Sequence, residues 1–440
     1  MKYLVVLGAG ESGVGAALLG KAKNWKVFVS DYGKIAPKYQ DILTENEIDF
    51  EEEQHTWEII EGADLVVKSP GIPDKSPLIQ KLKAQNTPII SEIEWAAKFT
   101  RAKLIGITGS NGKTTTTSLI YHLLKKANLN VGLGGNIGNS FAAMVVDDSF
   151  DYYVLELSSF QLEGIKDCAF EIAVLLNISP DHLDRYDYKM ENYVQAKLQI
   201  QKNSKEDSCI IYNAEDDYFK TATELKNTSA KILTFGTTAD KNAFYTSENL
   251  IVQNTYNIHV NDFSLVGKHN YSNALAAMLV GAQLGIEENV VKDALQTFVA
   301  IPHRLEKVAV VNGVEYINDS KATNVEATYF ALEAMKKPVH WIVGGVDKGN
   351  DYSTLIPFVQ QKVKSILCLG KDNQKIVEVF GSIIPIINEC SSAKQVVEKA
   401  AEIAQEGDIV LLSPCCASFD LFKNYEDRGN QFKKEINLLK

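Results

Sequence analysis

The stretch Gly106-Ile-Thr-Gly-Ser-Asn-Gly-Lys-Thr-Thr-Thr-Thr117 decides the fold of this chain. Residues 103–107, which lead into this stretch, are largely apolar and rich in branched side chains, and this predicts a short buried strand. The threonine run then leads into an apolar helix around residues 119–124. A strand, a glycine loop, a lysine, a hydroxyl and a helix, in this order, are typical of a loop that binds nucleotide phosphates.

The chemistry of phosphate binding explains the residue types in this loop. Glycines let successive backbone N–H groups turn toward one anion, and the N-terminus of the following helix adds a partial positive charge. Lys113 would reach the β- and γ-phosphates, and the hydroxyl of Thr114 would bind Mg²⁺. The strict spacing G-x-x-x-x-G-K-[ST] is not met, because Ile107 stands where the first glycine belongs. On this stretch alone, an ordinary glycine-rich turn remains an alternative.

Length and composition narrow the class of protein. With 440 residues the chain is too long for one ordinary core, so two or three domains are expected. A formal net charge of −11 argues against a nucleic-acid-binding surface. The six cysteines show no C-x-x-C spacing, and most of them are expected to be buried thiols in a reducing cytosol. No apolar run has membrane-spanning length and no signal peptide precedes the first strand, so we expect a cytoplasmic protein without membrane contact. We also expect a monomer.

A second glycine motif, Gly8-Ala-Gly10-Glu-Ser-Gly13, lies near the N-terminus between a predicted strand and an Ala- and Leu-rich helix. By pattern alone it is a dinucleotide fingerprint with Asp31 on a ribose hydroxyl, although the motif leaves the identity of the ligand open. A turn at residues 69–73 can present backbone N–H groups at the same sheet edge. We place this small Rossmann-like domain at residues 1–93. Its strands are expected at residues 2–7, 26–30, 63–68 and 88–91.

The phosphate loop opens a second α/β domain, which we place at residues 94–298. Glu156 lies near the tip of a predicted strand, where an acidic residue holds Mg²⁺ in nucleotide-binding sheets. His182 follows the next strand end; a lone histidine is more often structural, but this position favours a functional role. The segment 132–138 is too glycine-rich for a strand interior and is predicted to be a ligand loop. Strands are expected at 152–157, 172–177, 209–213 and 232–235 and within 250–266, with a helix at 270–284.

A third α/β domain is predicted over residues 299–440. Asn312-Gly313 between two apolar runs is a strong hairpin signal. Strands and helices then alternate, and each strand is followed by glycines or polar residues. Beyond the hairpin, strands are expected at residues 339–343, 365–369, 383–387 and 408–412.

Taken together, these motifs resemble those of the Mur ligases of peptidoglycan synthesis, and the resemblance covers all three domains. The motifs that carry it are Gly109-Ser-Asn-Gly-Lys-Thr-Thr115, Leu155-Glu-Leu-Ser-Ser-Phe-Gln161, Pro180-Asp-His-Leu-Asp-Arg185, Pro302-His-Arg304 and Asn318-Asp-Ser-Lys-Ala-Thr323. The C-terminal Ser413-Pro-Cys-Cys-Ala-Ser-Phe-Asp420, with Lys423-Asn-Tyr-Glu426 and Arg428-Gly429, resembles the members that add D-glutamate. It is less similar to those that add the first alanine, the third residue or the terminal dipeptide. The short loop spacing noted above is the family's own form.

The resemblance implies an activity. The carboxylate of UDP-N-acetylmuramoyl-L-alanine would attack the γ-phosphate of ATP to give an acyl phosphate. The amine of D-glutamate would then attack that carbonyl and release phosphate. Because two anions must meet, cations and metal ions have to dominate catalysis, and two Mg²⁺ ions beside Lys113 suit that task. The first domain would bind UDP rather than a dinucleotide.

The resemblance also assigns site residues by position. Catalytic roles fall to Lys113, Glu156, His182 and Lys197. ATP contacts fall to Gly109, Ser110, Asn111, Gly112, Lys113, Thr114, Thr115, Asn273, Arg304, Asp319 and Lys321. Contacts with the UDP-linked substrate fall to Gly10, Ser12, Gly13, Asp31, Ser69, Gly71, Asn136 and Gln161. D-glutamate would contact Thr323, Lys348, Ser418 and Tyr425, the last standing where phenylalanine is expected. Metal ligands would be Thr114, Glu156, His182 and Lys197.

Lys197 needs a separate argument, because an ammonium beside Mg²⁺ is repelled. Lys197 shares a helix face with Tyr193 and Ile200, and its position matches the lysine that the family carbamylates. A partly desolvated lysine has a lowered pKa and can react with carbon dioxide as the free amine. The resulting carbamate is an anion whose oxygens suit a hard metal. The alternative is a surface lysine whose ammonium extends to solvent.

Three other functions remain open on sequence alone. A dehydrogenase would use the N-terminal fingerprint but leaves Glu156, His182 and the loop at 106–117 without a role. A catalytically inactive relative acting as a binding module would be expected to have lost one of the site residues. Folylpolyglutamate synthase also adds glutamate through an acyl phosphate, but it is not expected to carry the UDP-type first domain.

Overall fold

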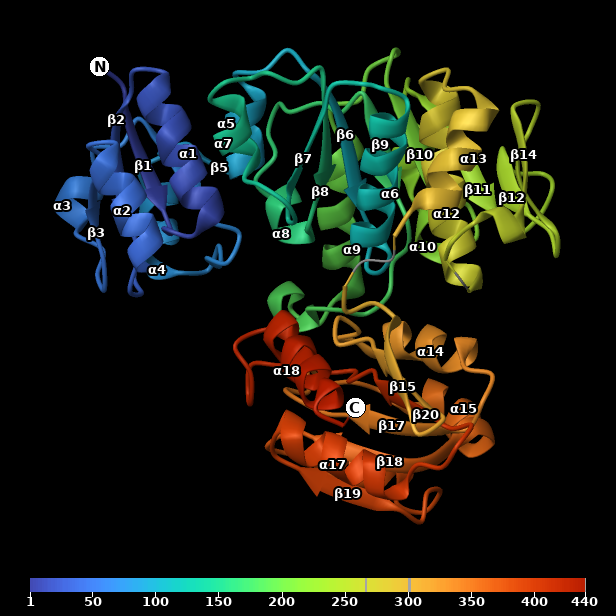
Figure 1. Ribbon diagram of the computed structural model, residues 1–440. Coiled ribbons are helices and arrows are strands. Elements are labelled where there is room, and N and C mark those ends of the chain that lie inside the picture. Colours follow the sequence, from blue (N-terminus) through green and yellow to red (C-terminus); the bar gives the residue numbers. More distant parts are fainter. Residues whose placement is uncertain (266, 300–301, 440) are drawn as a thin grey trace. The chain divides into compact units, whose positions relative to one another are not determined.

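The computed structural model describes residues 1–265, 267–299 and 302–439 of the chain. Three sheets, each accompanied by helices, confirm the predicted α/β class (Figure 1). The chain divides into two compact units, one formed by residues 1–263 and 270–298 and the other by residues 264–269 and 299–440. The first two sheets lie in the first unit and the third sheet lies in the second. Within the described ranges, no helix combines the length and apolarity needed to cross a membrane.

The first sheet is a five-stranded parallel sheet in the order β3-β2-β1-β4-β5. Its strands are β1 (Tyr3–Leu7), β2 (Lys26–Ser30), β3 (Asp49–Glu51), β4 (Leu65–Lys68) and β5 (Ile89–Ile90). Its helices are α1 (Glu11–Ala22), α2 (Pro37–Glu45), α3 (Trp57–Ile60), α4 (Pro77–Ala84) and α5 (Glu92–Ala97). The sequence does not predict β3, because its three residues include only one apolar side chain. The predicted limit of the first domain, between residues 93 and 94, falls within α5.

The second sheet has nine strands in the order β14-β13-β12-β11-β10-β9-β6-β8-β7. Its strands are β6 (Lys103–Thr108), β7 (Val131–Gly135), β8 (Tyr152–Glu156), β9 (Ile172–Leu175), β10 (Cys209–Asn213), β11 (Lys231–Gly236), β12 (Ala243–Tyr245), β13 (Asn249–Val252) and β14 (Tyr256–His259). The strands from β7 to β12 are parallel, and β13 and β14 extend the sheet as an antiparallel ribbon. Because β6 lies between β8 and β9, the loops that follow these three strands share one sheet edge.

The helical segments of this sheet follow the predicted alternation. The helices are α6 (Lys113–Lys126), α7 (Phe141–Val145), α8 (Ser159–Leu162), α9 (Met190–Leu198), α10 (Asp217–Thr221), α11 (Thr223–Lys226), α12 (Lys268–Gln283) and α13 (Glu288–Thr297). Short 3-10 turns occur at η1 (Leu183–Tyr186), η2 (Gln199–Gln201) and η3 (Val260–Asp262). The antiparallel region predicted within 250–266 ends earlier, at His259, and Val266 lies outside the described residues.

The prediction of a ligand loop at residues 132–138 is wrong for its first half, because residues up to Gly135 form β7. The glycines answer a packing constraint. A Cβ atom at Gly135 would lie 2.2 Å from the carbonyl oxygen of Glu156, and Gly132 lies close to the Phe150 ring. Glycine therefore lets β7 lie close to its neighbours, which is a recognised exception to its low strand propensity.

The first two sheets are joined by packing around α5 (Figure 1). Trp95 donates a hydrogen bond to the carbonyl oxygen of Ala16 on α1 (3.2 Å), and a Cβ atom at Gly15 would lie 2.0 Å from the Ser140 hydroxyl. Glu92 accepts hydrogen bonds from that hydroxyl and from the backbone N–H of Ala142, at 2.7 and 2.6 Å. These contacts bury one apolar core that includes residues of both sheets.

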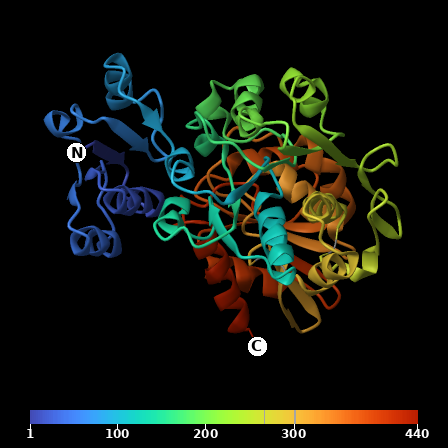
Figure 2. The same ribbon diagram turned by 90° about the horizontal axis from the view of Figure 1, so that it is seen from above.

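The third sheet has the order β15-β16-β20-β17-β18-β19, and its helices cover both faces. Its strands are β15 (Glu306–Val311), β16 (Val314–Asn318), β17 (Val339–Val343), β18 (Val363–Leu369), β19 (Ile387–Cys390) and β20 (Ile409–Leu412). Its helices are η4 (Ser353–Leu355), α14 (Val325–Ala334), α15 (Ile356–Lys362), α16 (Gln374–Phe380), α17 (Ala393–Ile403) and α18 (Tyr425–Asn437). Helices α14 to α16 pack on one face and α17 and α18 on the other. The C label lies beside the red helix, α18, in Figure 2.

Two sequence predictions for this sheet have opposite outcomes. The hairpin at Asn312-Gly313 is confirmed, since β15 and β16 are antiparallel and both turn residues have positive φ. The strand predicted at 383–387 is wrong, because β19 begins only at Ile387. Pro385 lies inside the apolar run and cannot donate a strand hydrogen bond, so pairing starts after it.

A buried polar cluster lies in the third sheet. His340 contacts the hydroxyl of Ser365 at 2.7 Å and a carboxylate oxygen of Asp408 at 3.1 Å, and Lys364 donates to both Asp408 oxygens. Burial alone would raise the pKa of Asp408, but the hydrogen bonds from Lys364 and His340 outweigh burial and hold the pKa below its usual value. The cluster therefore stabilises the folded state through an ionised carboxylate.

We expect Asp408→Asn to lower the free energy of unfolding by about 2 kcal/mol at neutral pH, because hydrogen bonds to a charged group are lost. The folded pKa lies below the unfolded value of about 3.9, so this stabilisation is complete above about pH 4 and is lost as the pH falls through the folded pKa. Urea unfolding between pH 8 and pH 3 measures the difference in the free energy of unfolding between the wild type and the variant. The exposed pair Lys394–Glu398 provides the control, and Glu398→Gln should change little at any pH. If the difference in the free energy of unfolding between the wild type and Asp408→Asn stayed constant down to pH 3, this account would be contradicted.

Candidate active site

The phosphate loop joins β6 to α6, as predicted. Gly112 caps the N-terminus of α6 with φ of 81°, a left-handed conformation that glycine adopts without strain. A Cβ atom at this residue would lie 2.4 Å from the amide oxygen of Asn273 on α12. That oxygen is fixed, because it also accepts a hydrogen bond from the hydroxyl of Thr116 (3.2 Å) and Asn273 is buried. The loop, α6 and α12 are thus packed together around Gly112.

Two lysines converge on this loop. The ammonium of Lys113 donates to the carbonyl oxygens of Gly109 (2.7 Å) and Ser110 (2.8 Å). The side-chain nitrogen of Lys197, from α9, donates to the same Gly109 oxygen (2.8 Å). Lys197 is only 1% exposed, so it is not the surface lysine of the alternative interpretation. Burial lowers the pKa of Lys197 well below its usual value, and the charge of Lys113 lowers it further, against the opposing charges of Asp181 and Glu156.

The loop after β9 also forms hydrogen bonds with the phosphate loop. The backbone N–H of Asn111 donates to the side chain of Asn177 (2.8 Å), which in turn donates to the carbonyl oxygen of Asn111 (3.1 Å). The hydroxyl of Ser110 donates to the carbonyl oxygen of Ser179 (2.9 Å). Sequence reasoning gave no role to Asn177 or Ser179. Their only signal is a polar run directly after a buried strand that neighbours the phosphate-loop strand.

Glu156 ends β8, in register with Ile107 of β6. One of its oxygens accepts a hydrogen bond from the side chain of Asn136 (2.8 Å). The other, Oε2, is buried and has no hydrogen-bond partner among the residues that the structure describes. A buried carboxylate oxygen without a partner is costly unless something cationic binds it, so it fits the oxygen-ligand chemistry of Mg²⁺. Thr114 is buried in the first turn of α6, at the same edge of the sheet.

His182 follows β9 and has a positive φ of 52°, which is uncommon for a residue other than glycine. Its Nε2 atom lies 3.6 Å from a carboxylate oxygen of Asp181, and its ring packs edge-on against Phe160. Within the described residues, no three His, Cys, Asp or Glu side chains form a preformed metal cluster. Gln161, next to Phe160, uses its amide oxygen to accept from Ser158 in a capping box at the start of α8.

The first sheet carries the second glycine loop. A Cβ atom at Gly13 would lie 1.8 Å from the carbonyl oxygen of Gly8, so only glycine permits this close helix–strand approach. Asp31 accepts hydrogen bonds from the backbone N–H groups of Ala9 (2.6 Å) and Gly33 (2.8 Å), which places it at the loop. Ser69 also lies next to this loop, because a Cβ atom built on Gly8 would be 2.6 Å from the Cβ atom of Ser69. Gly10 and Ser12 lie at the start of α1.

Arg185 links that region to the second sheet, and sequence reasoning assigned it no role. Its guanidinium donates to the carbonyl oxygens of Pro70 (2.8 Å), Gly71 (3.2 Å) and Ile72 (3.2 Å). The same group lies 4.4 Å above the ring of Phe160, the residue that contacts His182. The turn after β4 is therefore tied to the segment that carries His182.

The third sheet gathers the remaining predicted residues at the ends of β16, β20 and β17, which are neighbouring parallel strands. Asp319 accepts hydrogen bonds from the hydroxyl of Ser413 (2.9 Å) and the backbone N–H of Leu305 (3.2 Å). Burial raises the pKa of Asp319 to about 7, although the nearby charge of Arg304 opposes that rise. The Nε atom of Arg304 is buried, and no described residue accepts a hydrogen bond from it.

The other residues predicted at this edge follow the same three strands. Lys321 and Thr323 lie in the loop after β16, Lys348 follows β17, and Ser418 follows β20. Lys321 lies 5.1 Å from the ring centre of Tyr425 at the start of α18. The loops after β17 and β20 pair directly through Val346 and Ala417.

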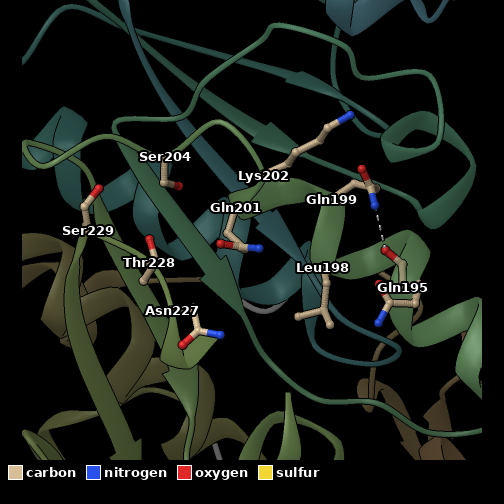
Figure 3. Close-up of a pocket in the computed structure, with 9 residues that line it drawn as sticks. All are labelled: Gln195, Leu198, Gln199, Gln201, Lys202, Ser204, Asn227, Thr228 and Ser229. Carbon is tan, nitrogen blue, oxygen red and sulfur yellow. Dashed lines mark hydrogen bonds between the residues drawn. The ribbon is translucent and has the colours of Figure 1, made fainter. Parts of the chain in front are cut away.

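A separate surface pocket of about 520 Å³ lies beside the end of α9 (Figure 3). Most of its lining residues have polar side chains, and they come from α9, η2, the residues that follow η2 and the segment before β11. The lining residues are Gln195, Leu198, Gln199, Gln201, Lys202, Ser204, Asn227, Thr228 and Ser229. Lys197 is not among them, so this pocket is distinct from the residues around the phosphate loop.

Comparison with family models identifies three matching segments of the chain. Residues 2–91 match the Mur ligase MurD-like N-terminal domain, residues 107–281 the Mur ligase middle domain, and residues 303–416 the Mur ligase glutamate ligase domain. The chain belongs to the Mur ligase family. The resemblance inferred from the motifs is thereby confirmed, and so is the succession of three Mur ligase domains.

Full-length relatives narrow the position within the Mur ligases. The chain is 50% identical to a protein of Christiangramia forsetii, with 100% of both chains covered, and 48% identical to one of Bacteroides thetaiotaomicron, again with 100% of both covered. A protein of Cytophaga hutchinsonii is 45% identical over 98% of each chain. All three are named UDP-N-acetylmuramoylalanine--D-glutamate ligase.

Solved Mur ligase structures share the fold. UDP-N-acetylmuramate-alanine ligase MurC of Thermotoga maritima aligns with a TM-score of 0.66 at 18% identity, covering 100% of both chains. MurF ligase of Thermotoga maritima, solved in complex with ADP, aligns with a TM-score of 0.62 at 17% identity, covering 96% of this chain and 99% of that one. At this identity the likeness establishes the Mur ligase fold alone.

We expect Gly112→Ala to weaken ATP binding by about tenfold or more, because a left-handed alanine costs about 1–2 kcal/mol and its methyl group would displace Asn273. Gly62→Ala is the matched control, since Gly62 has open space around its Cβ position and no positive φ. Calorimetric titration with ATP, together with the melting temperature of each variant, measures both effects. Equal ATP affinity in the two variants would show that the geometry of Gly112 does not matter for nucleotide binding.

Proposed function

We propose that the protein is the ATP-dependent ligase that adds D-glutamate to UDP-N-acetylmuramoyl-L-alanine in cytoplasmic peptidoglycan precursor synthesis. The observation that carries the proposal is the convergence of Lys113, Lys197 and Glu156 around one phosphate loop. It occurs in a chain that is half identical, over its whole length, to proteins named for that reaction. The two substrates and the order of steps follow from this assignment.

The first step joins two anions, the substrate carboxylate and the γ-phosphate of ATP. Lys113 supplies a positive charge at the phosphoryl group that transfers, and the N-terminus of α6 adds its partial charge. Asn111 and Ser110 keep the loop in shape through their bonds to Asn177 and Ser179. The residues therefore orient the phosphates before the reaction, which is where most of the rate enhancement of phosphoryl transfer arises.

Mg²⁺ fits the residues at this edge of the sheet. Thr114 and the unpartnered oxygen of Glu156 would hold one ion, and Glu156, His182 and a carbamylated Lys197 would support a second. The ions would supply charge neutralisation between the two reacting anions. Asn136 fixes the other oxygen of Glu156, so the carboxylate is oriented before any ligand binds.

The remaining contacts follow the sheets. The glycine loop Gly10–Gly13, Asp31 and the turn at Ser69–Gly71 would bind the UDP part of the substrate, with Asn136 and Gln161 nearer its reacting end. Arg304, Asp319, Lys321 and Asn273 would complete the ATP site. Thr323, Lys348, Ser418 and Tyr425 would hold D-glutamate, with the lysine and the hydroxyls matched to its carboxylates.

The test is phosphate release with UDP-N-acetylmuramoyl-L-alanine, ATP and Mg²⁺. We expect turnover with D-glutamate, none with L-glutamate, and loss of turnover in a folded Lys113→Ala variant. Lys125→Ala is the control, because Lys125 is exposed in the last turn of the same helix. Phosphate release with another amino acid and not with D-glutamate would assign the chain to a different ligase. Nicotinamide absorbance changes in the absence of ATP would favour a dehydrogenase, and activity on folates would favour folylpolyglutamate synthase.

We further propose that Lys197 is carbamylated in the active protein. Its complete burial and its lowered pKa favour the free amine that carbon dioxide needs. In the reaction the nitrogen of the neutral amine bonds to the carbon of carbon dioxide and releases one proton, which leaves an anionic carbamate. Counted from the ammonium form of the lysine, two protons are released and the charge changes from +1 to −1. The new carboxylate would lie beside Lys113, where the repulsion between two ammonium groups would be replaced by attraction.

For Lys197→Ala we expect loss of activity that added short-chain carboxylic acids restore in part, because they replace the missing carboxylate. Lys202→Ala, at an exposed lysine just beyond the same helix, should keep wild-type activity with or without the acids. Mass spectrometry after trapping of the carbamate, and electron density at the lysine tip, check the modification directly. A fully active Lys197→Ala variant, or a bare amine in carbon-dioxide-equilibrated crystals, would overturn the assignment.

A further inference from the structure

We propose that Arg428 is a positioning residue for the incoming amino acid: its guanidinium fixes, relative to one another, the three loops that carry Thr323, Lys348 and Ser418. This inference rests on the proposed function, because it concerns the site assigned there to D-glutamate. The argument uses contacts inside the third sheet and its helices only.

Arg428 lies in the first turns of α18 and is 1% exposed. Its Nε atom donates to the hydroxyl of Ser320 (3.0 Å), and Nη2 donates to the carbonyl oxygen of the same residue (2.9 Å). Both terminal nitrogens donate to the carbonyl oxygen of Cys416 (3.2 Å each), and Nη1 donates to that of Gly344 (3.4 Å). One planar group thus binds three separate segments of the backbone.

These three segments are the loops after β16, β17 and β20, whose strands are neighbours in the sheet. Each bound residue is followed closely by a proposed D-glutamate contact: Ser320 by Thr323, Gly344 by Lys348, and Cys416 by Ser418. Because the guanidinium is a rigid fork, it sets the spacing of the three backbones as well as holding each one. A lysine at this position could hold some of the carbonyls but could not reproduce that spacing.

The electrostatics point the same way. Within the described residues, no carboxylate forms an ion pair with Arg428, so a buried cation is held by a hydroxyl and neutral carbonyls alone. Burial lowers the pKa of Arg428 to about 10, and the charges of Asp420 and Asp319 oppose the fall, so the group stays charged at neutral pH. A buried charge without an ion pair is costly. A substrate with two carboxylates, bound over these loops, would be attracted by it.

The competing explanation is that Arg428 only stabilises the fold. Lys362 offers a matched comparison in the same unit, because its ammonium also binds three carbonyl oxygens: those of Leu332 (2.9 Å), Glu333 (2.8 Å) and Met335 (2.9 Å). These carbonyls lie at the end of α14, not in the loops at the carboxyl edge of the sheet. Removal of Lys362 should therefore affect stability without affecting the amino-acid site.

The experiment compares Arg428→Lys, Arg428→Ala and Lys362→Met with the wild type, using melting temperature and steady-state kinetics for each substrate. We expect both Arg428 variants to raise KM for D-glutamate by about tenfold or more, which corresponds to about 1.4 kcal/mol, with KM for the UDP substrate within about twofold of wild type. KM for ATP should rise less than KM for D-glutamate, because only one of the three loops, that of Ser320, also carries proposed ATP contacts. Lys362→Met should lower the melting temperature and leave all three KM values unchanged. Guanidinium at low, non-denaturing concentration should lower KM for D-glutamate in Arg428→Ala and not in Lys362→Met.

Two results would overturn the inference: a wild-type KM for D-glutamate in either folded Arg428 variant, or equal rises in all three KM values. If Arg428→Ala does not fold, Arg428→Lys alone decides the question. The failure of the proposed function looks different, since the wild type itself would then release no phosphate in the presence of D-glutamate.

Discussion

The phosphate-loop site is constrained by one contact: the side-chain nitrogens of Lys113 and Lys197 donate to the same carbonyl oxygen, that of Gly109. Two cations so close together in a buried site cannot both keep their charge cheaply, and Lys197 is the one that is fully buried. The neighbouring elements are arranged around this conflict. Glu156 and Asp181 bring negative charge from the ends of β8 and the loop after β9, while the start of α6 adds positive potential. The two lysines and the start of α6 therefore favour the binding of an anion, or a modification that removes one of the positive charges.

Much of the fold and of the candidate site could be predicted from the sequence, for a topological reason. In a parallel sheet the carboxyl ends of neighbouring strands meet at one edge, so motifs that follow buried strands must lie together. Lys113, Glu156 and His182 each follow or end such a strand, and their grouping needs no knowledge of contacts. Their roles as ligands remain proposals, because proximity to a phosphate loop does not identify what is bound.

The sequence was least informative where the partner is the backbone. Arg185 and Arg428 both bind backbone carbonyl oxygens. Every residue has such an oxygen, so the sequence does not indicate which ones will bind an arginine. The glycines of β7 were misread for a related reason: their signal suggests a loop, whereas the constraint is the carbonyl oxygen of Glu156 lying against Gly135. Lys197 shows the opposite case, since its helix face was predictable but its complete burial required the structure.

The joint between the first two sheets has a consequence for how the chain folds during synthesis. Gly15 on α1 packs against Ser140, which leaves the ribosome much later, and the ring of Trp95 bonds to Ala16 only once α5 has formed. The entropy cost of closing a loop grows slowly with its length, so the long separation between these residues in the sequence lowers the equilibrium stability only slightly. In kinetic terms it leaves the small-residue face of α1 uncovered while the second sheet is still being made. The packing of the first sheet is thus complete only after Ser140 has been synthesised.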